Sequence, residues 1–106
     1  MVIAYDRRFS SEFLAEAAAE VVLAHGIPVA ISTTAVPTQM SSYEVVERGA
    51  AAGVVITASH NPWMDNGFKV KSPTGAAAGP DLLAEIEAGI AANAGTAIER
   101  LPFAEA

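Results

Sequence analysis

Short apolar runs alternate with helical segments along this chain, and this alternation is the feature that most limits its fold. Residues 2–5, 28–31 and 53–57 are continuous apolar runs of strand length, as expected for strands buried on both faces. Helical spacing of apolar residues lies between them, over residues 12–25 and 38–51. Because strands that alternate with helices are typical of parallel sheets, we expect an α/β fold.

The second half of the chain predicts a fourth strand and a last helix. Residues 67–71 alternate between polar and apolar, and the connection over 58–66 is shorter than the dozen or more residues of a parallel crossover. The fourth strand should therefore be antiparallel. Pro80 suits the first turn of a helix over 80–93. We expect one domain over 1–106, a three-layer α/β/α sandwich with a mixed, mostly parallel four-stranded sheet.

Three helix faces are predicted from the positions of their apolar side chains. Serines and a glycine suggest the helix ends: Ser10 or Ser11 as N-cap of the first helix, Ser41 with Glu44 as a capping box, and Gly26 after the first helix. The side chains expected to face inward are Phe13, Leu14, Ala17, Ala18, Val21 and Val22 in the first helix, Met40, Tyr43, Val46 and Ala50 in the second, and Leu82, Leu83, Ile86 and Ile90 in the last.

Composition excludes several functional classes. The 106 residues carry 6 Lys and Arg against 12 Asp and Glu, a net charge of −6, which argues against a nucleic-acid surface or a polybasic membrane patch. The absence of cysteine excludes disulfides, thiolate metal sites and cysteine nucleophiles. No apolar run approaches the ~20 residues of a membrane span, and no signal peptide is visible. We therefore expect a cytoplasmic protein.

The third apolar run ends on a polar loop, Thr57-Ala-Ser-His-Asn-Pro62. Serine, asparagine and proline are ordinary turn residues, and each alone is more often structural than catalytic. In α/β sheets, however, ligands collect at the carboxyl ends of the strands, where Ser59 follows the run directly. With His60 beside it and Lys69 near the start of the returning strand, the hydroxyl suits phosphate better than an acyl group.

These residues also resemble a known family. Thr57-Ala-Ser-His-Asn-Pro62 followed by Asp65-Asn-Gly-Phe-Lys69 is similar to the active-site serine signature of the α-D-phosphohexomutases, which include phosphoglucomutases, phosphomannomutases and phosphoglucosamine mutases. Asp6-Arg-Arg-Phe-Ser-Ser11 resembles the family's D-x-R-x-S-S loop, with Arg8 as its arginine. Val36-Pro-Thr38 resembles the segment before the second helix, although Gln39 stands where proline is frequent.

The resemblance implies that this chain is the first domain of a four-domain enzyme. Ser59 would carry a phosphate that passes to a hexose phosphate, giving a glucose or mannose 1,6-bisphosphate, so that phosphate moves between C1 and C6. Ser59 would also bind Mg²⁺ through its phosphate, with aspartates of a later domain. His60 and Lys69 would transfer protons and stabilise charge, and Arg8 and Asn61 would support the loop.

The mutase interpretation is limited by parts of the family pattern that this chain lacks, and two other interpretations stay open on the residues alone. The family's D-x-D-x-D metal loop is absent, since the only aspartates are Asp6, Asp65 and Asp81. We therefore expect the 106-residue domain alone to be inactive. One alternative is an anion-binding module that holds phosphate with an unmodified serine. The other is a structural domain that has no phosphate affinity and is indifferent to Ser59→Ala.

Overall fold

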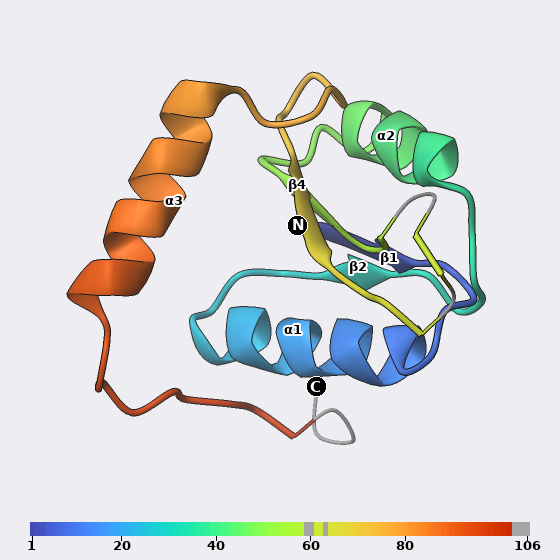
Figure 1. Cartoon of the computed structure of the whole chain (residues 1–106). Coiled ribbons are helices and arrows are strands. Elements are labelled where there is room, and N and C mark those ends of the chain that lie inside the picture. The colour runs from blue at the N-terminus through green and yellow to red at the C-terminus, as the bar shows by residue number, and fades with distance from the viewer. Residues whose placement is uncertain (59–60, 63, 103–106) are drawn as a thin grey trace.

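The computed structural model, which describes residues 1–58, 61–62 and 64–102, arranges its elements as a sheet between helices (Figure 1). The elements, in chain order, are β1 (Val2–Tyr5), α1 (Ser11–Ala24), β2 (Ala30–Ile31), α2 (Thr38–Glu47), β3 (Gly53–Ile56), β4 (Phe68–Lys71) and α3 (Pro80–Ala92). The predicted order of strands and helices is confirmed.

The sheet has the strand order β2-β1-β3-β4. β1 lies parallel to β2 and to β3, whereas β4 is antiparallel to β3, with Phe68 opposite Ile56. α1 and α2 lie on opposite faces of this sheet (Figure 1). The mixed α/β/α sandwich, with the last strand antiparallel, is therefore confirmed.

The core on the α1 side is built from alternate residues of the two central strands. Ile3 and Tyr5 of β1 and Val54 and Ile56 of β3 form one buried cluster with small residues of α1. Ala15 and Ala19 are the α1 members of this cluster, and both are fully buried. Because an alanine has only a methyl side chain, the helix can approach the sheet closely, so small residues make a dense core.

The opposite face is packed just as tightly by α2. Val45 is fully buried. A Cβ added at Gly53 of β3 would lie 2.6 Å from Cγ2 of Val45, which is closer than real Cβ atoms approach. Gly53 is therefore required by the close approach of α2 to the strand.

The predicted inward faces of α1 and α2 are wrong in part. The buried residues of α1 are Ser11, Ala15 and Ala19, whereas Phe13 is 68% exposed. An alanine-rich helix offers several stripes at helical spacing, and the stripe of smallest residues faces the sheet because it permits the closest packing. The predicted residues that the structure leaves exposed are Phe13 and Leu14 in α1, and Met40, Tyr43 and Val46 on the α2 side, where Ser41 and Val45 are buried instead.

The inward face predicted for α3 is wrong in part, since Leu82 and Ile86 are half-buried but Leu83 and Ile90 are exposed. None of the α3 side chains is buried, and the helix stands away from the sheet (Figure 1). Leu83 and Ile90 are 41% and 67% exposed. Periodicity identifies an apolar face, but it does not identify the surface that covers it. After α3, the chain returns to α1, where the Leu101 N–H donates to the Glu20 carbonyl oxygen.

Local signals at the helix ends are confirmed only in part. Gly26 has a φ of +74°, as expected for the residue that ends α1. Ser10 is the N-cap residue of α1, but it makes no side-chain capping bond and has a φ of +63°. The capping box expected at Ser41 is wrong, because α2 begins after Pro37 and the Ser41 hydroxyl donates to the Thr38 carbonyl oxygen.

Within the described residues, no helix has both the length and the apolar character that a membrane crossing requires.

Candidate functional site

The loops that carry the polar motifs meet at one edge of the sheet. β1, β2 and β3 run parallel, so their carboxyl ends, at Tyr5, Ile31 and Ile56, share that edge. β4 starts at the same edge, because Phe68 pairs with Ile56. The loop after β1 and the connection from β3 to β4 are therefore neighbours, although they are about fifty residues apart in sequence.

Asp6, the first residue after β1, is the centre of a hydrogen-bond network at this edge. Its Oδ1 accepts from the backbone N–H of Arg8 at 3.1 Å and from the Ser11 hydroxyl at 2.9 Å. Its Oδ2 accepts from Nε of Arg8 at 2.8 Å and from the Thr57 hydroxyl at 2.6 Å. Each carboxylate oxygen thus accepts two hydrogen bonds, and one of the two comes from Arg8.

Arg8 extends this network to the far side of the serine motif. Its Nη1 donates to the Asn61 carbonyl oxygen at 2.6 Å and to the Pro62 carbonyl oxygen at 2.8 Å. Its side chain is only 9% exposed, against 28% for Asp6, so the ion pair between them is partly shielded from water. Arg8 and Asn61, the two residues predicted to support the loop, are therefore in direct contact.

Asn66 joins the approach to β4 to the start of α1. Its Nδ2 donates to Oγ of Ser11 at 2.9 Å and to the Phe9 carbonyl oxygen at 3.1 Å. Its Oδ1 accepts from the Gly67 backbone N–H at 2.9 Å. The residues on either side of the connection from β3 to β4 are therefore tied to the loop after β1.

Lys69 lies on β4, opposite Val55 of the antiparallel partner strand. Phe68 and Lys69 point to opposite faces, because successive side chains alternate along a strand. Phe68 lies on the α1 side, and Lys69 therefore lies on the α2 side, one residue from the edge where the loops meet. The position predicted for its side chain, close to this edge and opposite to Phe68, agrees with the pairing.

Two predicted catalytic residues, Ser59 and His60, lie outside the described residues. The described part of the chain contains no group of three or more His, Asp or Glu that could hold a metal ion. The carboxylate of the network, Asp6, already accepts four hydrogen bonds. The described residues therefore do not form a Mg²⁺ site of their own.

The Asp6 carboxyl is held in its ionised form. Burial alone raises its pKa, but the hydrogen bonds from Thr57, Ser11 and Arg8 outweigh burial and hold the pKa below its ordinary value. In Tyr5, next to it, burial and the negative charges of Glu12 and Glu16 raise the pKa of the phenol. The arrangement at Asp6 is that of a fixed anion that organises donors, and not of a proton carrier.

Stability should therefore depend on pH through Asp6. Since its pKa is lower in the folded state, Asp6 contributes stability that is present above its unfolded pKa of ~3.9 and is lost as the pH falls through the folded pKa. We expect Asp6→Asn to reduce the free energy of unfolding at pH 7 by about 2–4 kcal/mol. Urea unfolding at pH 7 and at pH 3 measures this, and the difference between wild type and variant should shrink at pH 3. An unchanged difference would contradict the role of the charge.

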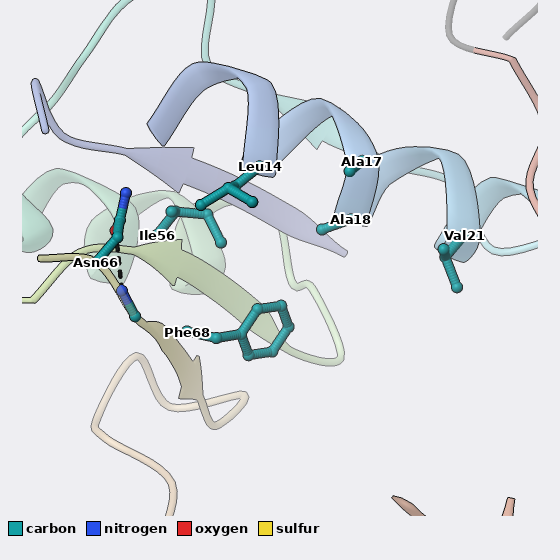
Figure 2. Close-up of a pocket in the computed structure, with 8 residues that line it drawn as sticks. Leu14, Ala17, Ala18, Val21, Ile56, Asn66 and Phe68 are labelled. Atoms are coloured by element: carbon teal, nitrogen blue, oxygen red, sulfur yellow. Dashed lines mark hydrogen bonds between the residues drawn. The ribbon is translucent and has the colours of Figure 1, made fainter. Parts of the chain in front are cut away.

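An apolar hollow lies elsewhere on the surface, between α1 and β4. Figure 2 shows Leu14 and Phe68 on either side of it, with Asn66 at its margin. It measures about 460 Å³. Its lining is Leu14, Ala17, Ala18, Val21, Ile56, Asn66, Gly67 and Phe68. Since this lining has no charged side chain, it is unsuited to phosphate, and the polar edge is the better candidate site.

Sequence reasoning missed the residues at the centre of the network. Asp6, Ser11, Thr57 and Asn66 were not assigned roles in the site, although all of them lie within the quoted motifs or beside them. The available signal was an aspartate placed directly after a buried strand, at the edge where loops meet. Its partners could not be identified from spacing, because Thr57 is 51 residues away.

Comparison with known proteins gives consistent matches. The family model described as "Phosphoglucomutase/phosphomannomutase, alpha/beta/alpha domain I" matches residues 1–96. A glucose 1,6-bisphosphate synthase of Mus musculus is 48% identical over 81 residues, which cover 71% of this chain and 13% of that protein. A probable phosphoglucosamine mutase of Thermococcus gammatolerans is 41% identical over 87 residues, which cover 82% of this chain and 19% of that protein.

A solved structure gives the same result for the fold. The crystal structure of a putative phosphomannomutase from Thermus thermophilus matches with a TM-score of 0.81 and 34% identity. The match covers 82% of this chain and 20% of that one. The chain therefore spans at most about a fifth of the length of these relatives.

Proposed function

Because the chain belongs to the phosphoglucomutase/phosphomannomutase family, as its α/β/α domain I, we propose that it supplies the phosphoserine of a phosphohexomutase. The domain would act as one part of a larger enzyme, since it spans only a small share of its relatives. The substrate is a hexose phosphate, and the remaining domains of the enzyme determine which hexose phosphate is used.

The observation that supports this proposal is the way the described residues on either side of Ser59 are held. Thr57 directly follows β3 at the carboxyl edge of the sheet, and Arg8 holds the carbonyl oxygens of Asn61 and Pro62 on the other side of Ser59. A loop held on both sides can present one hydroxyl in a fixed place. Phosphoryl transfer depends mainly on such positioning and on neutralising the equatorial oxygens.

The reaction then proceeds in two balanced transfers. The phosphoryl group leaves the oxygen of phosphorylated Ser59 for the free hydroxyl at C1 or C6 of the hexose phosphate. The proton of that hydroxyl passes to the serine oxygen. This gives a hexose 1,6-bisphosphate and the free serine. After the bisphosphate reorients in the cleft, its other phosphoryl group is transferred to the Ser59 oxygen, whose proton passes to the sugar oxygen that is left. The isomeric hexose phosphate is then released. His60 and Lys69 are proposed to assist the proton transfers and to stabilise charge.

Mg²⁺ has a limited place in this proposal. The described residues form no metal site, so an ion would need the phosphate of Ser59 and aspartates of another domain. Its chemistry would be the neutralisation of phosphoryl oxygens. The proposal about this chain therefore concerns the serine, its neighbours and the loop that holds them.

Phosphate on Ser59 is the direct test. We expect the intact enzyme to carry one phosphate on Ser59, detected by intact mass and peptide mapping, and to lose it when incubated with glucose or mannose monophosphate. A hexose 1,6-bisphosphate should restore it. An unmodified serine in a protein that still binds inorganic phosphate would favour an anion-binding module. No phosphate binding and no modification would favour a purely structural domain.

A further inference from the structure

One carboxylate connects all the segments that surround the serine motif. Three branches start at Asp6: the hydroxyl of Thr57, the side chain of Arg8, and the hydroxyl of Ser11, which in turn accepts from Asn66. We call these five residues, Asp6, Arg8, Ser11, Thr57 and Asn66, the Asp6 clamp. They come from the carboxyl end of β1, the start of α1, the end of β3 and the approach to β4.

The first two branches reach the two flanks of the serine. Thr57, two positions before Ser59, donates to Oδ2 at 2.6 Å. Asn61 and Pro62, two and three positions after Ser59, offer their carbonyl oxygens to Nη1 of Arg8, whose Nε donates to the same Oδ2 at 2.8 Å. A single carboxylate oxygen is therefore linked to the Thr57 side chain before the serine and, through Arg8, to the backbone after it.

The third branch reaches the strand that carries the lysine. Asn66, three positions before Lys69, is bonded to Oγ of Ser11, which donates to Oδ1 of Asp6 at 2.9 Å. β4 follows, in which Phe68 and Lys69 pair with Ile56 and Val55. The Asp6 clamp thus connects the serine loop and the start of β4 to the same side chain.

We propose that Asp6 is a positioning residue for phosphoryl transfer, whose carboxylate fixes the serine loop on both flanks and sets it relative to the strand of Lys69. The expected effect of Asp6 on catalysis rests on the proposed function, but the holding of the loop can be measured independently of it. Misplacing a reacting group by ~1 Å can reduce the rate by about 100-fold without a large change in substrate binding.

Asp6→Asn is the informative substitution, because an amide cannot satisfy this set of donors. Arg8 presents a fixed donor to each oxygen, its backbone N–H to Oδ1 and its Nε to Oδ2. Neither N–H can reverse its role. Whichever way the amide is turned, its NH₂ group faces an Arg8 N–H, and one bond to the arginine is lost.

The matched control is Glu44→Gln. Glu44 accepts from Nε of Arg48 at 2.7 Å, the same pairing of carboxylate and guanidinium as Asp6 with Arg8, but on the exposed surface of α2. If Asp6→Asn prevents folding, Thr57→Val provides the second variant, because it removes one hydroxyl and keeps the shape of the side chain. Thr57→Val deletes a single branch of the Asp6 clamp.

The experiment combines hydrogen exchange with steady-state kinetics in the full-length enzyme. For Asp6→Asn we expect amide exchange over residues 57–67 to rise at least about tenfold while α2 is unchanged, and kcat to fall about 10- to 50-fold with KM within about twofold. Thr57→Val should show smaller changes in the same direction, and Glu44→Gln should show neither. In the double variant that combines Asp6→Asn with Arg8→Lys, kcat should fall by less than the product of the two single fold-losses.

The possible outcomes test the holding of the loop by the Asp6 clamp separately from the proposed function. Unchanged loop exchange in Asp6→Asn and Thr57→Val would overturn the proposal, whatever the kinetics show. Faster loop exchange with normal kcat would overturn the positioning role, as would a rise in KM alone. If wild-type Ser59 never carries phosphate, the proposed function fails, and the exchange data alone still decide whether Asp6 holds the loop.

Discussion

Replacing Ser59 by alanine should reduce the turnover of the intact enzyme by at least about 10⁴-fold, the largest effect that we expect from any single substitution. The serine oxygen is the proposed carrier of the phosphoryl group, so its removal leaves no route by which the phosphate can change position. A coupled assay of the conversion of hexose 1-phosphate to hexose 6-phosphate measures the loss. KM for the substrate should change little, because in the proposed enzyme the sugar is bound mainly by the other domains.

Ser72→Ala is the control for this substitution. This substitution also removes only a hydroxyl. Ser72 lies just after β4, at the end remote from the serine loop, where its hydroxyl forms a hydrogen bond with that of Thr74. Its turnover should stay within about twofold of wild type. Normal turnover of Ser59→Ala, with the substitution verified by mass, would end the assignment of Ser59 and favour the structural alternative.

The layered fold could be predicted from sequence because its signals are local. Residues 53–56 form a continuous apolar run, and all four are buried in β3, as a central strand with helices on both faces requires. The antiparallel direction of β4 followed from the shortness of its connection. β2 is shorter than expected, at Ala30–Ile31, and Pro28 lies outside the residues that pair with β1.

The packing partners and the hydrogen-bond network could not be predicted in the same way. Alanine-rich α1 has several possible apolar stripes, and only the sheet decides that Ala15 and Ala19 are buried. The bonds of Thr57 to Asp6 and of Asn66 to Ser11 join residues 51 and 55 positions apart. Such pairs depend on which strands become neighbours, and one sequence gives residue types but not these distances.

Lys69→Met should produce the second largest effect, a fall in kcat of about 10²- to 10³-fold. The methionine keeps most of the volume of the side chain and removes its positive charge. Because the transferred phosphoryl group spreads negative charge over three oxygens, loss of the cation that we propose to act on it should destabilise the transition state more than the ground state. Single-turnover transfer from phosphorylated Ser59 to a hexose phosphate measures this step, and phosphate should still be present on the serine.

Lys71→Met tests whether position or charge alone matters. Lys71 lies on the same strand and the same face as Lys69, but it pairs with Gly53, at the end of β3 opposite to the serine loop. Both variants lose one positive charge, so any general effect of net charge is shared between them. We expect Lys71→Met to keep kcat within about twofold, since its ammonium group is too far along the strand to reach the phosphate. Equal losses in the two variants would show that Lys69 acts through the overall field of the domain and not at the transferred group.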